Sequence, residues 1–267
     1  MTPWQSLVVG QLGLGPLWRL RSRPLEDTPT IEPERAREAP RRPDPAPAIV
    51  PSTSRIAAPP APQARSVSTG STEVGGVPVS VPAGADWDLL ERQIRECTAC
   101  ELHRRRKQAV PGVGDRHPRW LLVGEGPGAE EDRRGEPFVG PAGRLLDAML
   151  AAVGLSREAG VFIANSVKCR PPGNRTPEAA EIATCFPYLK RQVELLGPRL
   201  IVALGRPAAQ SLLNREVRIA DVRGQTFEFA GIPVLVTYHP AYLLRNPHDK
   251  GKAWEDLCRA RSLSASD

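Results

Sequence analysis

The sequence predicts an α/β protein, a three-layer α/β/α sandwich around a central, mostly parallel four-stranded sheet, preceded by a disordered N-terminal extension. Four short apolar runs carry this prediction, because each is bounded by Gly, Pro or polar residues as buried strands are: 120–123, 161–164, 200–204 and 234–237. Stretches with the length and periodicity of helices separate the runs: 142–153, 177–196 and 207–213. Because strands and helices alternate, we expect the helices to cross between parallel strands.

Two further elements flank this core. Residues 87–96 place apolar side chains at helical spacing and predict a helix that leads into Cys97. Residues 227–236, with Ala230-Gly231 at their centre, predict a hairpin that ends in the last strand.

Composition sets the first part of the chain apart. Fifteen of the 29 prolines fall in the first 84 residues, which contain only two aromatic residues and no cysteine. Such a segment buries too little apolar surface to offset the entropy of ordering. We therefore expect a disordered Pro/Ala/Arg-rich linker over 24–84 and one folded domain over 85–263.

Residues 1–23 differ from the linker because they are rich in Leu, Val and Trp. We expect this segment to be a docking peptide for a replication or repair protein, with the linker as its tether. The alternative is an extra helix that packs on the domain, which several glycines and Pro16 disfavour.

The net charge of +6, from 36 Lys and Arg against 30 Asp and Glu, permits a polyanionic partner without requiring one. No apolar run approaches the ~20 residues of a transmembrane helix, and the apolar start lacks the features of a signal peptide. We expect a cytoplasmic protein that is monomeric and does not bind membranes.

Four cysteines form a candidate metal site. Cys97 and Cys100 make a C-x-x-C pair, Cys169 follows a predicted strand, and Cys185 lies on the next predicted helix. A zinc ribbon would repeat C-x-x-C in its second half, so a 4Fe-4S cluster is favoured over zinc, which stays the alternative. Unliganded core thiols are disfavoured by the charged stretch at 101–107. Cys258 is read as ordinary packing.

Polar and glycine residues follow each of the four predicted strands: 124–128, 165–170, 205–206 and 238–240. Because parallel strands end at one edge of a sheet, we expect Asn165 and His239 to line one crevice there. The alternative is that both residues merely form turns. Residues 124–128 lack the G-x-G-x-x-G spacing of a dinucleotide site, so their glycines suit a close approach of backbone to a ligand.

Four separated motifs complete the pattern: Gly124-Glu125-Gly126-Pro127-Gly128, Pro137-Phe138-Val139-Gly140-Pro141-Ala142-Gly143, Asn165 with Lys168-Cys169-Arg170-Pro171-Pro172-Gly173-Asn174-Arg175, and Tyr238-His239-Pro240-Ala241-Tyr242-Leu243-Leu244-Arg245. Their order and spacing, with the four cysteines, resemble the family 4 uracil-DNA glycosylases from about Cys97 to Trp254. The resemblance does not cover residues 1–84. It implies a monofunctional hydrolase of base excision repair, which removes uracil from single- or double-stranded DNA and leaves an abasic site. It also implies a 4Fe-4S cluster on the four cysteines.

The resemblance assigns roles in the pocket. Phe138 is expected to stack on the flipped uracil, and Asn165 to pair with its N3–H and O4. His239, as a neutral imidazole, is expected to stabilise the charge that gathers on uracil O2. Gly126 is expected to let the backbone approach the nucleotide.

The residue that activates water is less evident. Other glycosylase families place an Asp at the position of Gly126, and this chain does not. Within the acidic run Glu130-Glu131-Asp132, Glu131 matches best by position, and Glu125 is the second candidate. A solvated acidic turn explains the run equally well, and departure of uracil as an anion reduces how much a base must do.

DNA contacts are expected from cations near the crevice: Lys168, Arg170, Arg175, Arg206 and Arg245. Leu243 and Leu244 are expected to insert into the duplex as a wedge that replaces the extruded base. Scattered surface charge is the simplest alternative for the cations. Three other functions stay open: a non-catalytic iron-sulfur DNA-binding protein of the same fold, an iron-sulfur electron carrier, and a glycosylase for another deaminated base such as hypoxanthine.

Overall fold

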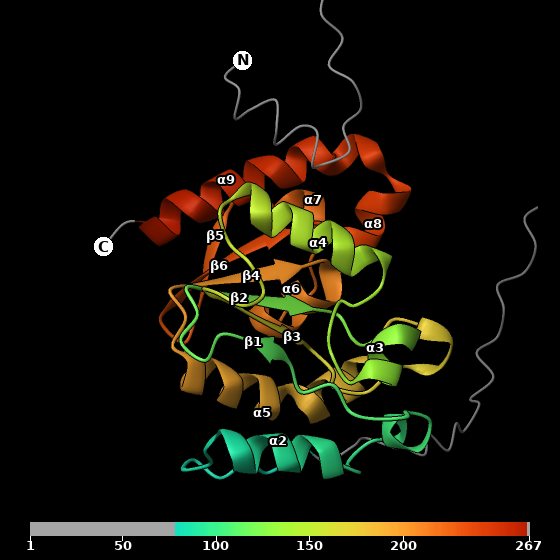
Figure 1. Ribbon diagram of the computed structural model, residues 1–267. Helices are drawn as coiled ribbons and strands as arrows, with labels where there is room; N and C mark the ends of the chain where they lie inside the picture. Colours follow the sequence, from blue (N-terminus) through green and yellow to red (C-terminus); the bar gives the residue numbers. More distant parts are fainter. Residues whose placement is uncertain (1–77, 266–267) are drawn as a thin grey trace, which may run out of the picture. The chain divides into compact units, whose positions relative to one another are not determined.

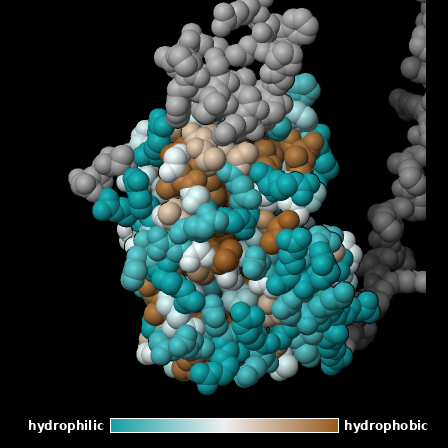
Figure 2. Space-filling view, in the orientation of Figure 1, coloured by the Kyte–Doolittle hydropathy of each residue, from teal (hydrophilic) through white to brown (hydrophobic). Residues whose placement is uncertain are grey.

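The computed structural model describes residues 78–265 (Figure 1). The predicted docking peptide and residues 24–77 of the predicted linker lie outside the described residues. None of the helices formed by residues 78–265 is long and apolar enough to cross a membrane. Hydrophilic residues cover most of the described surface on the face that Figure 2 shows, with apolar side chains in smaller patches between them.

One sheet forms the centre of the domain, and its strands lie in the order β1-β3-β2-β4-β6-β5. The strands are β1 (Val113–Gly114), β2 (Trp120–Gly124), β3 (Val161–Asn165), β4 (Leu200–Leu204), β5 (Thr226–Phe229) and β6 (Ile232–Thr237). The four central strands pair in parallel, as predicted, and β1 and β5 pair antiparallel at the two edges. The sheet therefore has six strands, whereas the sequence predicted four. β1 was not predicted because its two residues form no apolar run, and β5 is the first arm of the predicted hairpin.

Helices cover both faces of this sheet (Figure 1). One face packs against α4 (Pro141–Ala152), α8 (Pro240–Arg245) and α9 (Lys250–Ala265). The other face packs against α5 (Ala179–Leu196), α6 (Arg206–Leu213) and α7 (Ile219–Val222). Every residue of β2, β3 and β4 is buried, which explains why these strands read as continuous apolar runs.

A third, smaller core lies outside α5, where α2 (Trp87–Glu96) packs against that helix. The Asp86 side chain caps α2 by accepting a hydrogen bond from the Leu89 amide at 2.9 Å. Val79 and Val81 join this core, and the Val79 amide donates to the Thr184 carbonyl oxygen at 3.2 Å. Residues 78–84, which the composition assigned to the linker, thus pack with the domain.

The loops between these elements carry short helical turns: η1 (Glu101–Arg104), α3 (Ala129–Arg134), η2 (Pro172–Asn174) and η3 (Pro247–Asp249). Both α3 and η2 follow strands of the parallel set, after β2 and β3. They therefore lie beyond the carboxyl edge of the sheet, where ligands of such folds bind.

Candidate active site

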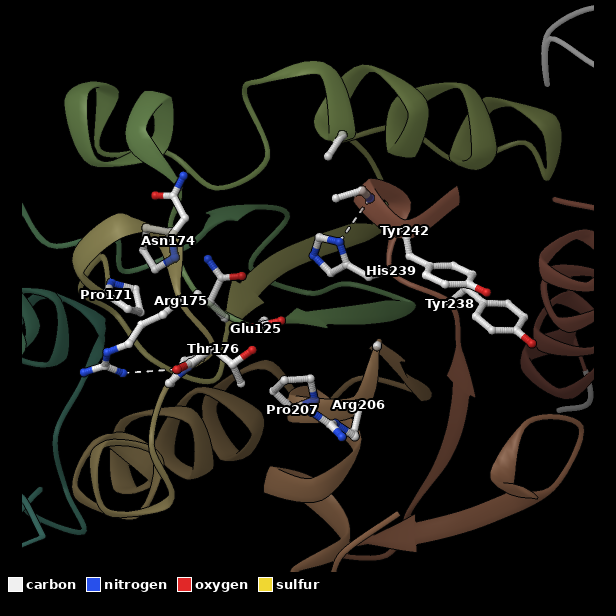
Figure 3. Close-up of a pocket in the computed structure, with 18 of the residues that line it drawn as sticks. Glu125, Pro171, Asn174, Arg175, Thr176, Arg206, Pro207, Tyr238, His239 and Tyr242 are labelled. Carbon is white, nitrogen blue, oxygen red and sulfur yellow. Dashed lines mark hydrogen bonds between the residues drawn. The ribbon is translucent and has the colours of Figure 1, made fainter. Parts of the chain in front are cut away.

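A cleft of about 840 Å³ opens at the carboxyl ends of the parallel strands (Figure 3). Each of the four central strands contributes to its wall: Glu125–Gly128 after β2, Asn165 at the end of β3, Gly205 and Arg206 after β4, and Tyr238 and His239 after β6. The convergence of Asn165 and His239 predicted from the strand ends is therefore confirmed. Phe138 and Gly126 line the same cleft.

Phe138 and Asn165 meet at the end of β2. Asn165 is only 2% exposed, and its Oδ1 accepts no hydrogen bond from any described residue. A Cβ added to Gly124 would lie 2.7 Å from the Phe138 ring and would overlap Asn165 Oδ1. Glycine at this position is what allows both side chains to sit over the end of the strand.

Phe138 is held by contacts that a linear sequence does not reveal. Its backbone has a φ of +56°, and Arg157 donates hydrogen bonds to the carbonyl oxygens of Pro137, at 2.8 Å, and of Phe138. An ion pair with Asp147 at 2.6 Å fixes the same guanidinium. No motif pointed to Arg157, which lies 19 residues from Phe138 in the chain.

His239 is the N-cap of α8, and its Nδ1 accepts a hydrogen bond from the Ala241 amide at 3.1 Å (Figure 3). Because a backbone amide can only donate, the proton of the neutral ring must be on Nε2. Burial, with the nearby positive charge of Arg245, lowers the pKa of His239 to about 4. The ring stacks on Phe138 with centroids 5.4 Å apart. His239 is thus a neutral Nε2–H donor beside an aromatic face.

Glu131 lies in the cleft wall but is occupied by backbone amides. Its Oε1 accepts from Val139 at 3.0 Å and Gly140 at 3.2 Å, and its Oε2 accepts from Gly128 at 3.1 Å. The carboxylate therefore fastens the turn after β2 to the turn that carries Phe138. The two neighbouring carboxylates do not line the cleft. Glu130 forms an ion pair with exposed Arg133, and buried Asp132 accepts a hydrogen bond from the Lys107 amide.

Glu125 is the other carboxylate in the cleft wall. Burial raises the pKa of its carboxyl group, while a hydrogen bond with Thr176 and the charge of Arg206 act in the opposite direction. Figure 3 shows these three residues on the same side of the pocket, across from His239.

The predicted cations separate into three groups. Arg245 and Arg175 line the cleft, although Arg175 also holds Glu181 with two hydrogen bonds of 2.7 and 2.9 Å. Arg170 bonds to Asn174 Oδ1 at 2.7 Å and is not part of the cleft lining. The prediction that Lys168 contacts DNA is wrong, because its side chain is 1% exposed and points into the protein. Arg206 is exposed and lines the cleft together with Arg245 and Arg175.

Of the two leucines predicted to form the wedge, the prediction is wrong for Leu243, because that side chain is buried too. Leu243 is 1% exposed and packs in the core beneath α8, on the face that meets α4. The next residue, Leu244, is 44% exposed. The sequence Leu243-Leu244 does not reveal which of the two leucines faces the core, since that depends on the phase of a helix of only six residues.

The four predicted ligand cysteines share the small core beside α2 and α5, with Cys169 and Cys185 buried and Cys97 and Cys100 partly buried. Three of the thiols have a hydrogen-bond donor: the Leu102 amide for Cys100, Arg106 Nη1 at 2.8 Å for Cys169, and the Lys168 amide for Cys185. The Tyr188 hydroxyl beside Cys97 donates instead to the Gln93 carbonyl oxygen at 3.1 Å. Burial raises the pKa of Cys169 to about 11 and that of Cys185 to about 12. Cys258 lies apart from them on α9.

Comparisons with known proteins agree with this architecture. The model of the uracil DNA glycosylase superfamily matches residues 111–258. A type-4 uracil-DNA glycosylase of Pyrobaculum aerophilum is 45% identical over 180 residues, which cover 64% of this chain and 91% of that protein. The type-4 uracil-DNA glycosylase of Thermotoga maritima is 44% identical over 180 residues, covering 66% and 93%. A type-5 uracil-DNA glycosylase of P. aerophilum is 34% identical over 150 residues, covering 50% and 66%.

The family model spans more than half of the chain, and the type-4 relatives are matched over most of their length. The resemblance noted from the motifs is confirmed: this chain belongs to the uracil-DNA glycosylase superfamily and, within it, to the type-4 enzymes.

Proposed function

We propose that this chain removes uracil from DNA in base excision repair by hydrolysing the bond between uracil N1 and the deoxyribose C1′. In this reaction the N1–C1′ electron pair leaves with uracil, water adds to C1′, and the base takes up a proton as it is released. The observation that carries the proposal is the meeting of an aromatic face, a buried amide and a neutral Nε2–H donor in one cleft: Phe138, Asn165 and His239.

Phe138 and Asn165 are proposed to recognise the flipped base. Uracil stacked on Phe138 would present N3–H to Asn165 Oδ1, the buried acceptor without a partner among the described residues, and O4 to the side-chain amide. Cytosine has an acceptor at N3 and a donor at C4, so it would leave both Asn165 groups unpaired. Gly126 lines the cleft, and a Cβ added to it would lie 2.8 Å from Val167 Cγ2, so packing against Val167 already favours glycine here. Its approach to the nucleotide stays a prediction.

His239 is proposed to donate its Nε2 proton as a hydrogen bond to uracil O2, where negative charge gathers as the bond breaks. The Ala241 amide fixes the ring and its tautomer before the substrate arrives. Such a preorganised donor is worth roughly 10²- to 10³-fold in rate. A neutral imidazole also avoids placing a full cation in the pocket when the base is absent.

Water is proposed to be oriented by Glu125 rather than by Glu131. All but one of the lone-pair positions of the Glu131 carboxylate are taken by backbone amides, which fits a positioning role. Glu125 faces the cleft, and its raised pKa reflects a carboxylate in a partly desolvated position.

The four cysteines are proposed to hold a 4Fe-4S cluster. A set of four thiolates suits either zinc or iron-sulfur ligation. Within residues 78–265 no three His, Cys, Asp or Glu side chains gather tightly enough for one metal ion, whereas a cluster needs only one cysteine at each iron. Hydrogen bonds to the thiols and the cations Arg106 and Lys168 fit an anionic group. When bound, the cluster cross-links the loop after α2, the loop after β3 and helix α5.

DNA is proposed to run along the open side of the cleft. Arg206 and Arg245 would contact phosphates and give affinity that depends on salt rather than on sequence. Leu244, exposed beside Arg245, keeps the role predicted for it, a wedge that fills the space of the extruded base.

The proposal is tested by incubating purified protein with oligonucleotides that contain uracil, hypoxanthine or a thymine mismatch. We expect free uracil and an alkali-labile abasic site from the first alone, in single and double strands. Binding without release of uracil would favour a non-catalytic DNA-binding protein, and release of hypoxanthine would widen the substrate range. Iron and zinc analysis of the same anaerobic preparation tests the cluster separately.

A further inference from the structure

Lys168 is a buried lysine whose charge is not balanced by a carboxylate of any described residue. Its ammonium donates to the backbone oxygen of Asn165 at 2.9 Å and to Gln192 Oε1 at 2.6 Å, and both acceptors are neutral. None of the ion pairs within residues 78–265 includes it. Burying an ammonium group without an anionic partner costs several kcal/mol, so an anion is expected nearby.

The groups that can supply this anion are the cysteines. Cys169 is the next residue along the chain, and the Lys168 backbone amide bonds to the Cys185 thiol. Cys169 and Cys185 are buried like Lys168 itself, and a thiolate at either position would act on the ammonium charge. The carboxylate beside Cys100, Glu181, is already held by Arg175.

The same side chain reaches the backbone of a residue that lines the cleft. It spans from the cysteine region to the carbonyl of Asn165, the residue whose side chain lines the cleft. Gln192, its other acceptor, donates to the Pro111 carbonyl oxygen at 2.8 Å, and the Lys168 carbonyl accepts from the Val110 amide at 2.8 Å. The position of the Asn165 backbone thus depends on a bond network anchored at Lys168.

We propose that Lys168 is the internal counter-ion of the four-cysteine cluster and, through its bond to the Asn165 carbonyl oxygen, a positioning residue for uracil recognition. This inference rests on the cluster proposed above. In this proposal Lys168 links the four-cysteine cluster to the cleft, and it does not make the DNA contact that its basic neighbourhood predicted.

The test compares Lys168→Met with Lys190→Met in anaerobically purified full-length protein. Lys190 is exposed on α5, the helix that also carries Cys185, so the control removes the same charge from the surface. Loss of a buried positive charge disfavours the more negative, reduced form of the cluster. We expect the midpoint potential of Lys168→Met to shift to more negative values and that of Lys190→Met to stay unchanged.

Catalysis provides the second readout. If Lys168 positions Asn165, the single-turnover rate of Lys168→Met on a uracil oligonucleotide falls by about tenfold to 10²-fold. Affinity for DNA without uracil stays unchanged, because the residue does not reach the surface. Lys190→Met keeps both properties.

A second variant covers the case in which Lys168→Met does not fold. Gln192→Glu keeps the lysine and gives it a carboxylate partner in place of a neutral acceptor. The carboxylate cancels part of the positive charge felt by the cluster, so the potential again shifts to more negative values.

The outcomes separate this inference from the cluster itself. Wild-type protein without iron overturns both. Iron-loaded variants, Lys168→Met or Gln192→Glu, with an unchanged midpoint potential overturn the counter-ion role while the cluster stands. A changed potential with a wild-type single-turnover rate in iron-loaded Lys168→Met overturns the link to Asn165.

Discussion

The cleft lined by Asn165 and the four-cysteine region lie on either side of the segment that follows β3. They differ in whether their buried polar groups have hydrogen-bond partners within the protein. The pocket holds a buried acceptor without a protein partner, Asn165 Oδ1, and a histidine kept neutral. The cysteine region supplies three of its four thiols with donors and encloses a lysine. The first region is arranged to pair with a ligand that binds and leaves, and the second fits the permanently bound cluster proposed above.

Cys185→Ser is expected to have the largest effect, and it tests whether the pocket depends on the four-cysteine region. Losing this buried ligand of the proposed cluster is expected to abolish cluster binding and to lower the free energy of unfolding by more than about 4 kcal/mol, in the range reached by loss of a metal site. Iron analysis and urea denaturation measure this. Cys258→Ser on α9, away from the cysteine region, is the matched control and should keep iron and stability. A stable, active Cys185→Ser protein without iron would show that the two regions are independent.

In the pocket, His239→Ala should keep the fold and lose roughly 10²- to 10³-fold in single-turnover rate, with DNA binding little changed. Equal losses of binding and rate would instead indicate a DNA contact. Asn165→Ala is the companion variant, because it acts on the other edge of the base.

The pH dependence follows from the pKa of His239, about 4 in the folded protein against ~6.5 in an unfolded chain. The ring stays neutral from about pH 5.5 to 8, so single-turnover rates should not follow a histidine titration near pH ~6.5. As pH falls, His239 takes up a proton in the unfolded chain before it does so in the folded protein. The stability that neutral His239 provides is therefore complete above about 6.5 and is lost as pH falls toward 4. A rate that rises as pH drops through ~6.5 would mean that the imidazolium is the active form.

Gly124→Ala tests whether glycine at the end of β2 shapes the pocket. The added methyl group meets the Phe138 ring and Asn165, so uracil excision should fall by about tenfold to 10²-fold. Gly251→Ala on α9, where an added Cβ meets nothing within 4 Å, should leave activity unchanged and raise stability by about 0.5–1 kcal/mol. Unaltered excision by Gly124→Ala would show that the two side chains can move without cost.

The smallest expected effect is that of Leu244→Ala. Loss of an exposed wedge should lower excision a few-fold from double strands and leave single strands unaffected, with stability within about 0.5 kcal/mol of wild type. The buried neighbour serves as the comparison. Leu243→Ala should lower the free energy of unfolding by about 2–5 kcal/mol and should change excision from single and double strands equally. Equal effects of Leu244→Ala on the two substrates would exclude the wedge.

The same two regions show what a sequence can and cannot predict. Parallel strands end at the same edge of a sheet whatever the loops do, so the prediction that Asn165 and His239 line one cleft followed from the parallel arrangement of the strands. The direction of a side chain in a loop obeys no such rule. Lys168 stands between Asn165 and Arg170 in a basic motif, and only the path of the chain after β3 turns it inward. Arg157 reaches Phe138 through tertiary packing, which leaves no local signal in the sequence.

The edges of the sheet bear on how this protein behaves at high concentration. β1 offers only two residues, and an added Cβ at Gly112 or Gly114 would overlap β3, so this edge lies close against its neighbour. On the opposite edge, β5 turns Thr226 and the charged Glu228 outward. Short and charged edge strands give a foreign strand little to pair with. The domain therefore resists growth of its sheet by a second copy, and concentrated solutions should stay free of β-type aggregates.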